Sequence, residues 1–310
     1  MSSDARSAAV AYGIAPAGAR LPADTRVGPV QLQVSDLGRS LDYYRQVLGM
    51  RLLRQDGGRA TLGAQLDPTP LIELVERPGA RPVPRRGQLG LYHFAILLPD
   101  RQALGRFVRH LASVGARAGA SDHLVSEALY LHDPDGLGIE VYADRPRSAW
   151  RVHETARGRE LAMSTEPLDL DGLVRAAGDA PWTGMPPGTV MGHVHLHVGD
   201  LDRAAAFYHA ALGLDAVVWS YPGALFLSAG GYHHHLGLNT WAGPNAAPAT
   251  PSDAQLLEWT LLLPEPGAAR RAAERLGQAG FDAEPSGAAS WTVSDPWGTR
   301  LRLTASTGAA

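Results

Sequence analysis

Residues 29–50 read PVQLQVSDLGRSLDYYRQVLGM, and residues 193–214 read HVHLHVGDLDRAAAFYHAALGL. The two segments align without a gap, and the identical pairs are Val30/Val194, Leu32/Leu196, Val34/Val198, Asp36/Asp200, Leu37/Leu201, Arg39/Arg203, Tyr44/Tyr208, Leu48/Leu212 and Gly49/Gly213. An internal repeat of this kind indicates a duplicated structural unit. The first position differs, because it is Pro29 in one copy and His193 in the other. A residue type that binds metals in only one copy suggests that one copy carries chemistry and the other carries structure.

Each repeat opens a unit with one strand, one helix and then further strands. Apolar and polar residues alternate over 28–34, which predicts a strand. Apolar residues then recur at three- and four-residue spacing over about 38–48, which predicts a helix that ends at Gly49. Three short strands are expected after that helix, near 51–54, near 59–62 and at 70–76.

The same plan recurs in three more units. The second unit is predicted to contain a strand at 91–98, a helix at about 101–114, and strands near 127–131 and 137–142. The third begins at His193 and includes strands near 224–228 and 233–240. The fourth begins near Leu256, has a helix near 267–279 and ends with the strand LRLTA. Asp-Pro-x-Gly sequences at 133–136 and 295–298 predict tight turns in the second and fourth units.

The chain is therefore predicted to be an α+β protein of four βαβββ modules that form two barrel-like clefts. A single module leaves one face of its sheet apolar, and two modules can bury that face against each other. The expected division of the chain is a disordered tail at 1–26, an N-terminal domain at 27–145 with modules one and two, a connector at 146–190, and a C-terminal domain at 191–306 with modules three and four.

Composition narrows the functional classes. The formal net charge is −3, which does not favour a nucleic-acid surface or an anionic membrane as a partner. The absence of cysteine excludes disulfides, thiolate ligands and a cysteine nucleophile. No apolar run approaches the roughly 20 residues of a membrane span, and the start MSSDARSAAVAYGIAPAGAR lacks the pattern of a signal peptide. We expect a cytoplasmic protein, and exposed edges of the repeats would allow a homo-oligomer.

Comparison of the modules isolates three metal-binding residue types. His93 in module two aligns with Glu258 in module four, and Glu140 aligns with Arg302, whose guanidinium would repel a cation. Together with His193 of module three, His93 and Glu140 have the composition of the 2-His-1-carboxylate triad, which leaves positions open on Fe(II). This hypothesis requires modules two and three to pair in space and leaves modules one and four as a structural cleft.

The segment AGGYHHHLGLNTW at 229–241 is the next signal. On a strand, neighbouring side chains point to opposite faces, so His233, His234 and His235 are not all expected to point inward. One inward histidine and two surface or supporting ones are predicted. A histidine beside a bound substrate could take and return a proton near neutral pH.

These residues resemble the vicinal oxygen chelate superfamily, and within it the type I extradiol ring-cleaving dioxygenases. The motif GHVHLHVGDLDRAAAFYHAALGL is typical of the superfamily, and DHLVSEALYLHDPDGLGIEVYADRP and SAGGYHHHLGLNTW are typical of the catechol 2,3-dioxygenase-like members. The resemblance covers roughly residues 27–304. It implies an Fe(II) centre, with Mn(II) also compatible, held by His93, Glu140 and His193, and a catechol-type substrate that is cleaved with O₂.

The resemblance also implies further site residues. Tyr130 matches the tyrosine that hydrogen-bonds the substrate, and His234 matches the acid–base histidine beside the O₂ site. Strand alternation favours His235 instead, so both stay open. The family has a histidine nine residues before the tyrosine, where this chain has Ser121; His123, seven before, is expected to fill that role. The ligands here come from modules two and three, whereas well-characterised relatives place them in modules three and four.

Two other functions are compatible with the scaffold. A metal-dependent lyase or isomerase of glyoxalase type would need a fourth protein ligand at a position that corresponds to Gly237, which cannot ligate. A non-catalytic, drug-sequestering protein would bind its ligand between aromatic side chains, and Trp219, Tyr221, Trp241 and Trp259 are candidates. The complete triad favours the dioxygenase over both.

Overall fold

The computed structural model describes residues 12–306 and shows four modules of one plan. Module one contains β1 (Arg26–Val34), α1 (Leu37–Gln46), β2 (Arg51–Asp56), β3 (Arg59–Gly63) and β4 (Pro70–Glu76). Module two contains β5 (Gln88–Leu97), α2 (Arg101–Ser113), β6 (Gly119–Asp122), β7 (Ser126–His132) and β8 (Gly138–Asp144). The strand β6 was not predicted from the sequence.

Modules three and four repeat the plan with small changes. Module three contains β11 (Val190–His197), α4 (Leu201–Ala205), the π-helical segment η2 (Ala206–Ala211), β12 (Asp215–Val218), β13 (Ala224–Ser228) and β14 (Leu236–Asn239). Module four contains β16 (Gln255–Leu263), α5 (Pro266–Gln278), β17 (Glu284–Gly287), β18 (Ser290–Ser294) and β19 (Arg300–Ala305). The short β15 (Ala247–Pro248) precedes module four and pairs with β5.

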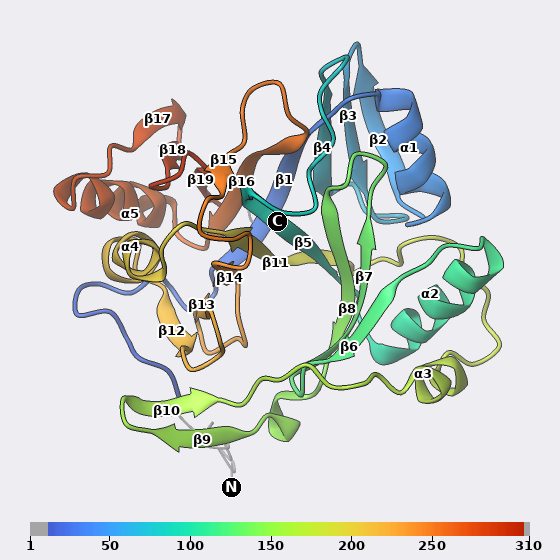
Figure 1. Ribbon diagram of the computed structural model, residues 1–310, viewed down its shortest axis with the longest axis horizontal. Coiled ribbons are helices and arrows are strands. Elements are labelled where there is room, and N and C mark those ends of the chain that lie inside the picture. Colours follow the sequence, from blue (N-terminus) through green and yellow to red (C-terminus); the bar gives the residue numbers. More distant parts are fainter. Residues whose placement is uncertain (1–11, 307–310) are drawn as a thin grey trace, which may run out of the picture.

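The modules combine into two curved sheets, each with strands from both halves of the chain (Figure 1). One sheet has the order β17-β18-β19-β16-β1-β4-β3-β2 and joins modules four and one through the antiparallel pair β16–β1. The other has the order β12-β13-β14-β11-β5-β8-β7-β6 and joins modules three and two through the antiparallel pair β11–β5. The predicted pairing of modules two and three is confirmed. In every module the first strand lies beside the last.

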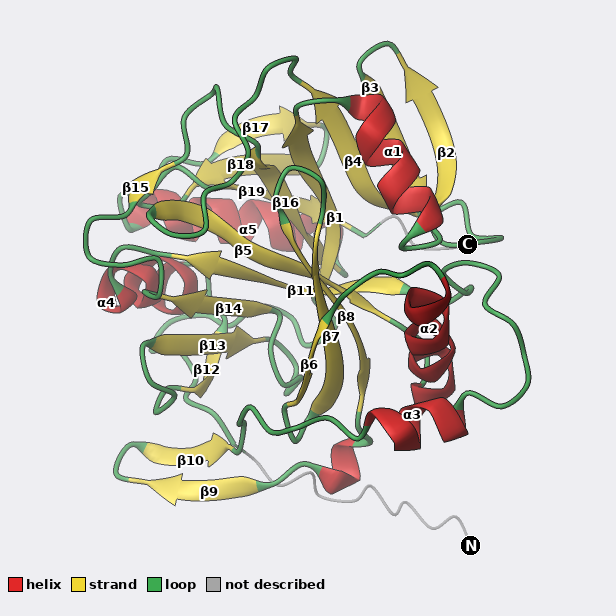
Figure 2. Cartoon of the chain, turned by 45° about the vertical axis from the view of Figure 1, so that its right-hand side comes forward, coloured by secondary structure: helices red, strands yellow, loops and turns green. Residues whose placement is uncertain are grey.

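Helices cover the outer faces of both sheets, and the apolar core lies between helices and strands (Figure 2). In the first sheet α1 packs on β4 and α5 on β18 and β19, and in the second α2 packs on β8 and α4 on β14. The alternating residues Val30, Leu32 and Val34 are fully buried, as the period-two pattern predicts. No helix among residues 12–306 has the length and apolar character needed to cross a membrane.

Most identities in the repeat have structural roles. Asp36 and Asp200 each accept a hydrogen bond from the backbone N–H three residues later, which caps the following helix. Tyr44 donates to Asp133 in the turn of module two (3.3 Å), and Tyr208 donates to Asp295 in the turn of module four (3.0 Å). Each repeated tyrosine therefore ties one sheet to the other.

The predicted disordered tail is too long. Residues 1–11 lie outside the described part of the chain, but Ile14 forms a β-bridge with Ala216. The backbone N–H of Leu21 donates to Gly213 O (2.8 Å), and the Leu21 side chain is buried. This stretch is rich in Ala, Gly and Pro, so its order comes from contacts with module three that the local sequence does not reveal.

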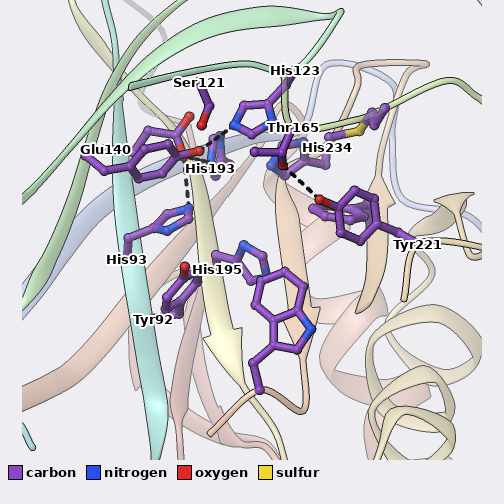
Figure 3. Close-up of a pocket in the computed structure, with 14 residues that line it drawn as sticks. Tyr92, His93, Ser121, His123, Glu140, Thr165, His193, His195, Tyr221 and His234 are labelled. Carbon is purple, nitrogen blue, oxygen red and sulfur yellow. Dashed lines mark hydrogen bonds and ion pairs between the residues drawn. The ribbon is translucent and has the colours of Figure 1, made fainter. Parts of the chain in front are cut away.

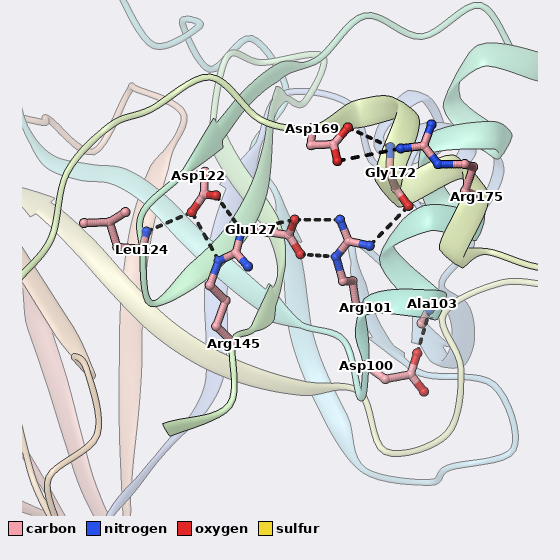
Figure 4. A network of polar contacts seen from close by, with 10 residues as sticks. All are labelled: Asp100, Arg101, Ala103, Asp122, Leu124, Glu127, Arg145, Asp169, Gly172 and Arg175. Atoms are coloured by element: carbon pink, nitrogen blue, oxygen red, sulfur yellow. Dashed lines mark hydrogen bonds and ion pairs between the residues drawn. The ribbon is translucent and has the colours of Figure 1, made fainter. Parts of the chain in front are cut away.

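The segment between the halves carries η1 (Arg147–Ala149), the hairpin β9 (Val152–Thr155) and β10 (Gly158–Leu161), and α3 (Leu170–Ala176). The short helix predicted near 168–177 is confirmed as α3, which packs on α2. Figure 4 shows the polar contacts that join α2, β7 and α3. Arg101 of α2 donates two hydrogen bonds to the buried Glu127 of β7 (2.6 and 3.0 Å) and a third to the Gly172 carbonyl of α3 (3.1 Å).

Replacing Arg101 with alanine should lower the free energy of unfolding by about 2 kcal/mol, because Glu127 would keep its burial and lose its bidentate partner. The loss is smaller than for a fully buried pair, since Arg101 is 36% exposed and Arg145 remains 3.4 Å from Glu127. Urea unfolding measures the difference. The control is Arg175→Ala, which breaks an exposed contact to Asp169 and should cost under about 0.5 kcal/mol. Equal losses in both variants would contradict this account.

Candidate metal centre

Three neighbouring central strands bring His93, Glu140 and His193 together (Figure 3). They stand on β5, β8 and β11, which lie next to one another in the second sheet. His93 Nε2 lies 3.0 Å and His193 Nε2 3.2 Å from the same carboxylate oxygen, Glu140 Oε2. All three residues are buried. Each offers one possible ligand atom, and these three atoms all lie within 4.8 Å of one another. Among residues 12–306 no other group of three or more His, Asp or Glu residues meets this condition.

The spacing of these atoms fits a metal ion. Metal–ligand bonds of about 2.1 Å at right angles place neighbouring donor atoms about 3.0 Å apart. His93 Nε2 is buried and lies near Glu140 without the alignment of a hydrogen bond, so this nitrogen has no hydrogen-bond partner among residues 12–306. Leaving such a group unpaired is costly, and a cation between the three residues would remove the cost. Two imidazoles and one carboxylate also suit Fe(II), Mn(II) and Zn(II).

The protonation states favour metal binding as well. Burial lowers the pKa of His93 and of His193, so both rings are neutral near pH 7. Burial alone would raise the pKa of Glu140, but the neighbouring His193 and His93 hold it well below its usual range. Neutral imidazole and ionised carboxylate are the forms that ligate a metal.

The three residues face a cavity of about 210 Å³. Its lining is aromatic and weakly polar, and the residues are Tyr92, His93, Ser121, His123, Tyr130, Glu140, Met163, Thr165, His193, His195, Tyr221, Phe226, His234 and Trp241. Glu140 is the one carboxylate among these lining residues, and none of them is Lys or Arg. A ligand here would meet aromatic faces, hydroxyl groups and imidazoles, but no side chain that is always cationic.

The predicted substrate-binding pair meets at the cavity wall. Tyr130 on β7 lies with its hydroxyl 2.6 Å from His123 Nε2, and His123 Nδ1 lies 2.7 Å from the Ser164 carbonyl. That carbonyl can only accept, so His123 carries its proton on Nδ1 and Nε2 accepts from the Tyr130 hydroxyl. Burial raises the pKa of Tyr130 well above its usual value, so the hydroxyl keeps its proton. Ser121 also lines the cavity.

The three consecutive histidines do not lie on a strand. The predicted strand at 233–240 is wrong at its start, because β14 begins at Leu236, and Gly230 and Gly231 adopt φ of 61° and 64° in the turn before it. Alternation therefore does not apply, and His233, His234 and His235 are all buried, against the expectation that two would not point inward.

Of these three, His234 lines the cavity, with its ring centre 4.1 Å from that of His193. Burial and the neighbouring histidines lower the pKa of His234 well below its usual value. His235 points elsewhere: its Nδ1 accepts from the Ala229 N–H and lies 3.2 Å from Ser228 Oγ, outside this cavity. The structure brings His234 to the candidate site and leaves His235 away from it.

Sequence reasoning missed His195, which lines the cavity two residues after His193 on the same face of β11. Asn239 Nδ2 donates to His195 Nε2 (2.9 Å). A Cβ at Gly237 would come within 2.7 Å of the His195 ring, so this ring occupies the place where a fourth protein ligand would stand. Period-two alternation from His193 could have found His195.

The aromatic residues that the sequence suggested for binding a ligand lie partly in the cavity and partly in the core. Tyr221 and Trp241 line the cavity, and Tyr221 shares a hydrogen bond with Thr165 (2.8 Å). Trp259 is fully buried beside Tyr208 in the core.

The first sheet has an ion pair where the second has the three ligand-type residues. Glu258 accepts a 2.5 Å hydrogen bond from Arg302 Nε, and Pro29 stands at the first position of module one. Glu73 occupies in module one the position that Glu140 has in module two. The sequence comparison overlooked this residue, which accepts a hydrogen bond from Gln31 (2.8 Å). A guanidinium at this place disfavours a cation.

Comparisons with known proteins show what this chain is similar to. The sequence profile of the Glyoxalase/Bleomycin resistance protein/Dioxygenase superfamily matches residues 26–141 and 190–303. Catechol-2,3-dioxygenase of Bacillus subtilis (strain 168) is 47% identical over 277 residues, which are 88% of this chain and 94% of that protein.

Two solved structures share the fold. The crystal structure of a candidate dioxygenase from Bacillus subtilis subsp. subtilis strain 168 has a TM-score of 0.64 at 14% identity and covers 94% of this chain and 87% of that one. Glyoxalase I from Zea mays has a TM-score of 0.52 at 20% identity and covers 91% of this chain and 92% of that one.

Proposed function

The chain belongs to the Glyoxalase/Bleomycin resistance protein/Dioxygenase superfamily, and within it we propose that the chain is a non-haem Fe(II)-dependent extradiol dioxygenase that cleaves a catechol ring beside the diol with O₂. The observation that carries this proposal is the buried group of His93, Glu140 and His193 at the wall of an aromatic cavity. Three protein ligands leave positions free for substrate and O₂. The 47% identity to a catechol-2,3-dioxygenase supports the same reaction.

A lyase or isomerase of glyoxalase type is the weaker candidate. Such a centre uses a fourth protein ligand, and the equivalent position is Gly237, over which the His195 ring lies. A drug-sequestering protein would not require three buried ligand-type side chains with matched protonation states. Both alternatives leave the open triad unexplained.

Bound iron supplies one chemistry here: it brings catechol oxygens and O₂ together and allows electron density to pass from the ring to O₂. The protein residues do the rest. Glu140 supplies negative charge to the centre, and the neutral rings of His93 and His193 add none. Tyr130 keeps its proton and donates it to His123 Nε2, so the Tyr130 oxygen is directed to accept a hydrogen bond from a substrate hydroxyl.

His234 is proposed as the group that moves a proton. A catechol loses at least one proton when it binds, and a neutral imidazole at the cavity wall can accept it. The same ring then returns the proton to the developing oxygen charge as the O–O bond breaks. Both oxygen atoms of O₂ end in the product, a ring-opened compound of the 2-hydroxymuconic-semialdehyde type.

The lining of the cavity also favours catechols without a charged substituent. No Lys or Arg lines it, so a carboxylate on the ring would be buried without a permanent countercharge. Aromatic faces from Tyr92, Tyr221, Phe226 and Trp241 suit a flat, apolar ring.

Metal content and O₂ uptake, measured together on anaerobically purified protein, test the function. We expect about one iron per chain, consumption of O₂ when catechol and ascorbate are added, and a yellow product. Bound zinc or nickel without O₂ uptake would favour the lyase, and no metal after reconstitution would favour a binding protein. Reconstitution with Mn(II) in parallel decides between the two metals. The cytoplasmic location and the homo-oligomer stay predictions.

A further inference from the structure

A chain of hydrogen bonds runs behind His234 from the cavity to the surface. His234 Nδ1 lies 2.7 Å from His233 Nδ1, and His233 Nε2 lies 2.8 Å from Asp144 Oδ1. Both rings are buried, whereas the Asp144 side chain is 28% exposed. None of these contacts belongs to the metal ligands. The proposed function uses His234 and leaves His233 and Asp144 without a role.

Asp144, at the surface end of this series of hydrogen bonds, is held in place by neighbouring side chains. The Tyr232 hydroxyl donates to the same oxygen, Asp144 Oδ1 (3.0 Å), and lies 2.8 Å from the Tyr142 hydroxyl. The Tyr232 and His233 rings lie 4.1 Å apart, centre to centre. Trp150 packs against the His233 ring at 5.5 Å. The Asp144 carboxylate thus accepts hydrogen bonds from both Tyr232 and His233. The His233 ring packs against the rings of Tyr232 and Trp150.

The order of donors and acceptors follows from what each atom can do. A carboxylate accepts, so His233 carries a proton on Nε2. In a neutral His233 the other nitrogen, Nδ1, is then bare and must accept. The hydrogen bond between the two Nδ1 atoms therefore takes its proton from His234. The remaining nitrogen of His234, Nε2, is left bare, and His234 lines the cavity.

We propose that His233 and Asp144 are positioning residues that hold the proton of His234 on Nδ1 and present its bare Nε2 to the cavity. The consequence rests on the proposed function: His234 begins each turnover as a base toward the substrate hydroxyl and becomes a donor only after it has taken that proton. The arrangement is an Asp–His–His series, in which each member fixes the tautomer of the next.

Two substitutions of similar size separate this role from packing. In His233→Asn the amide oxygen can take the place of Nδ1 and still accept from His234. In His233→Gln the amide nitrogen reaches the place of Nε2 and donates to Asp144, but no acceptor faces His234. We expect kcat within about threefold of wild type for Asn and a loss of about 10–100-fold for Gln, with KM and iron content unchanged in both.

Equal losses in the two variants, or a larger loss for Asn, would overturn the proposal. Glu127→Gln is the matched control, because Glu127 is a buried carboxylate on β7, beside the strand that carries Asp144, and it contacts Arg101 instead of the histidines. That variant should lose stability and keep kcat.

A second readout does not depend on turnover. In the diamagnetic Zn²⁺-loaded protein, ¹⁵N NMR of the histidine rings reports which nitrogen of His234 carries hydrogen. A proton on Nδ1 with a bare Nε2 supports the proposal, and a proton on Nε2 overturns it. If the tautomer is as proposed but the iron-loaded protein cleaves no catechol, the proposed function fails while this inference stands.

Discussion

Replacing His193 with alanine should leave a folded chain that no longer retains iron, and ring cleavage should fall by more than about 10³-fold. Changes to residues that only support a ligand cost about 10–100-fold in metal affinity or activity, and the loss of a ligand should cost more. His193 is one of the three ligand-type residues, and it comes from the C-terminal half of the chain, whereas His93 and Glu140 come from the N-terminal half. Iron content by elemental analysis and O₂ uptake with catechol measure the effect.

The control for this variant is His132→Ala, which removes an exposed imidazole at the end of β7. It should retain iron and activity. Circular dichroism shows whether His193→Ala is folded, which separates loss of the metal from loss of the protein. A folded His193→Ala protein with wild-type iron content would remove this residue from the centre.

Replacing His234 with alanine should give the opposite pattern: iron is retained, while kcat falls by about 10²–10⁴-fold, the usual worth of a positioned acid–base group. The ring lines the cavity beside His193 but is not one of the three ligand-type residues. KM should change little, because the imidazole acts on a proton and does not hold the ring. Steady-state kinetics with catechol, together with iron analysis of the same sample, test both parts.

His235→Ala distinguishes the two neighbours that the sequence left open. His235 accepts from the Ala229 N–H away from the cavity, so its loss should lower the melting temperature and leave kcat near the wild-type value. Unchanged turnover in His234→Ala, or a large loss of kcat in a folded His235→Ala, would reverse the assignment.

The repeat in the sequence was sufficient to predict the four modules, whereas the pairing of modules two and three was predicted only because the metal hypothesis required it. Because corresponding positions in the modules fall at corresponding places in a sheet, comparing them selected His93, Glu140 and His193 before any geometry was known. The same comparison overlooked Glu73, since only the first position of module one was considered. It also overlooked His195, which shares a face of β11 with His193.

Prediction from the local sequence pattern failed where the backbone forms neither a helix nor a strand. Three adjacent histidines suggested strand alternation, but a turn with two glycines at positive φ delays the strand until Leu236. The hydrogen bond from His233 to Asp144 joins residues far apart in sequence, so no spacing rule could reveal it. Residues 12–25 were misjudged for the same reason, because distant contacts give them order.

His93 and Glu140 come from one half of the chain and His193 from the other, and the pairing of β5 with β11 brings them together, so neither half contains all three ligand-type residues by itself. The carboxylate and one imidazole are synthesised first, and the second imidazole follows only after the connector has been made. If the proposed iron centre forms, its affinity would depend on assembly of the whole molecule, and the free energy of metal binding would stabilise the contact between the two halves. Under that proposal, removal of the metal by a chelator would weaken the contact between the halves as well as stop catalysis. Chains cut within 146–190 would regain the site only by complementation of the two fragments.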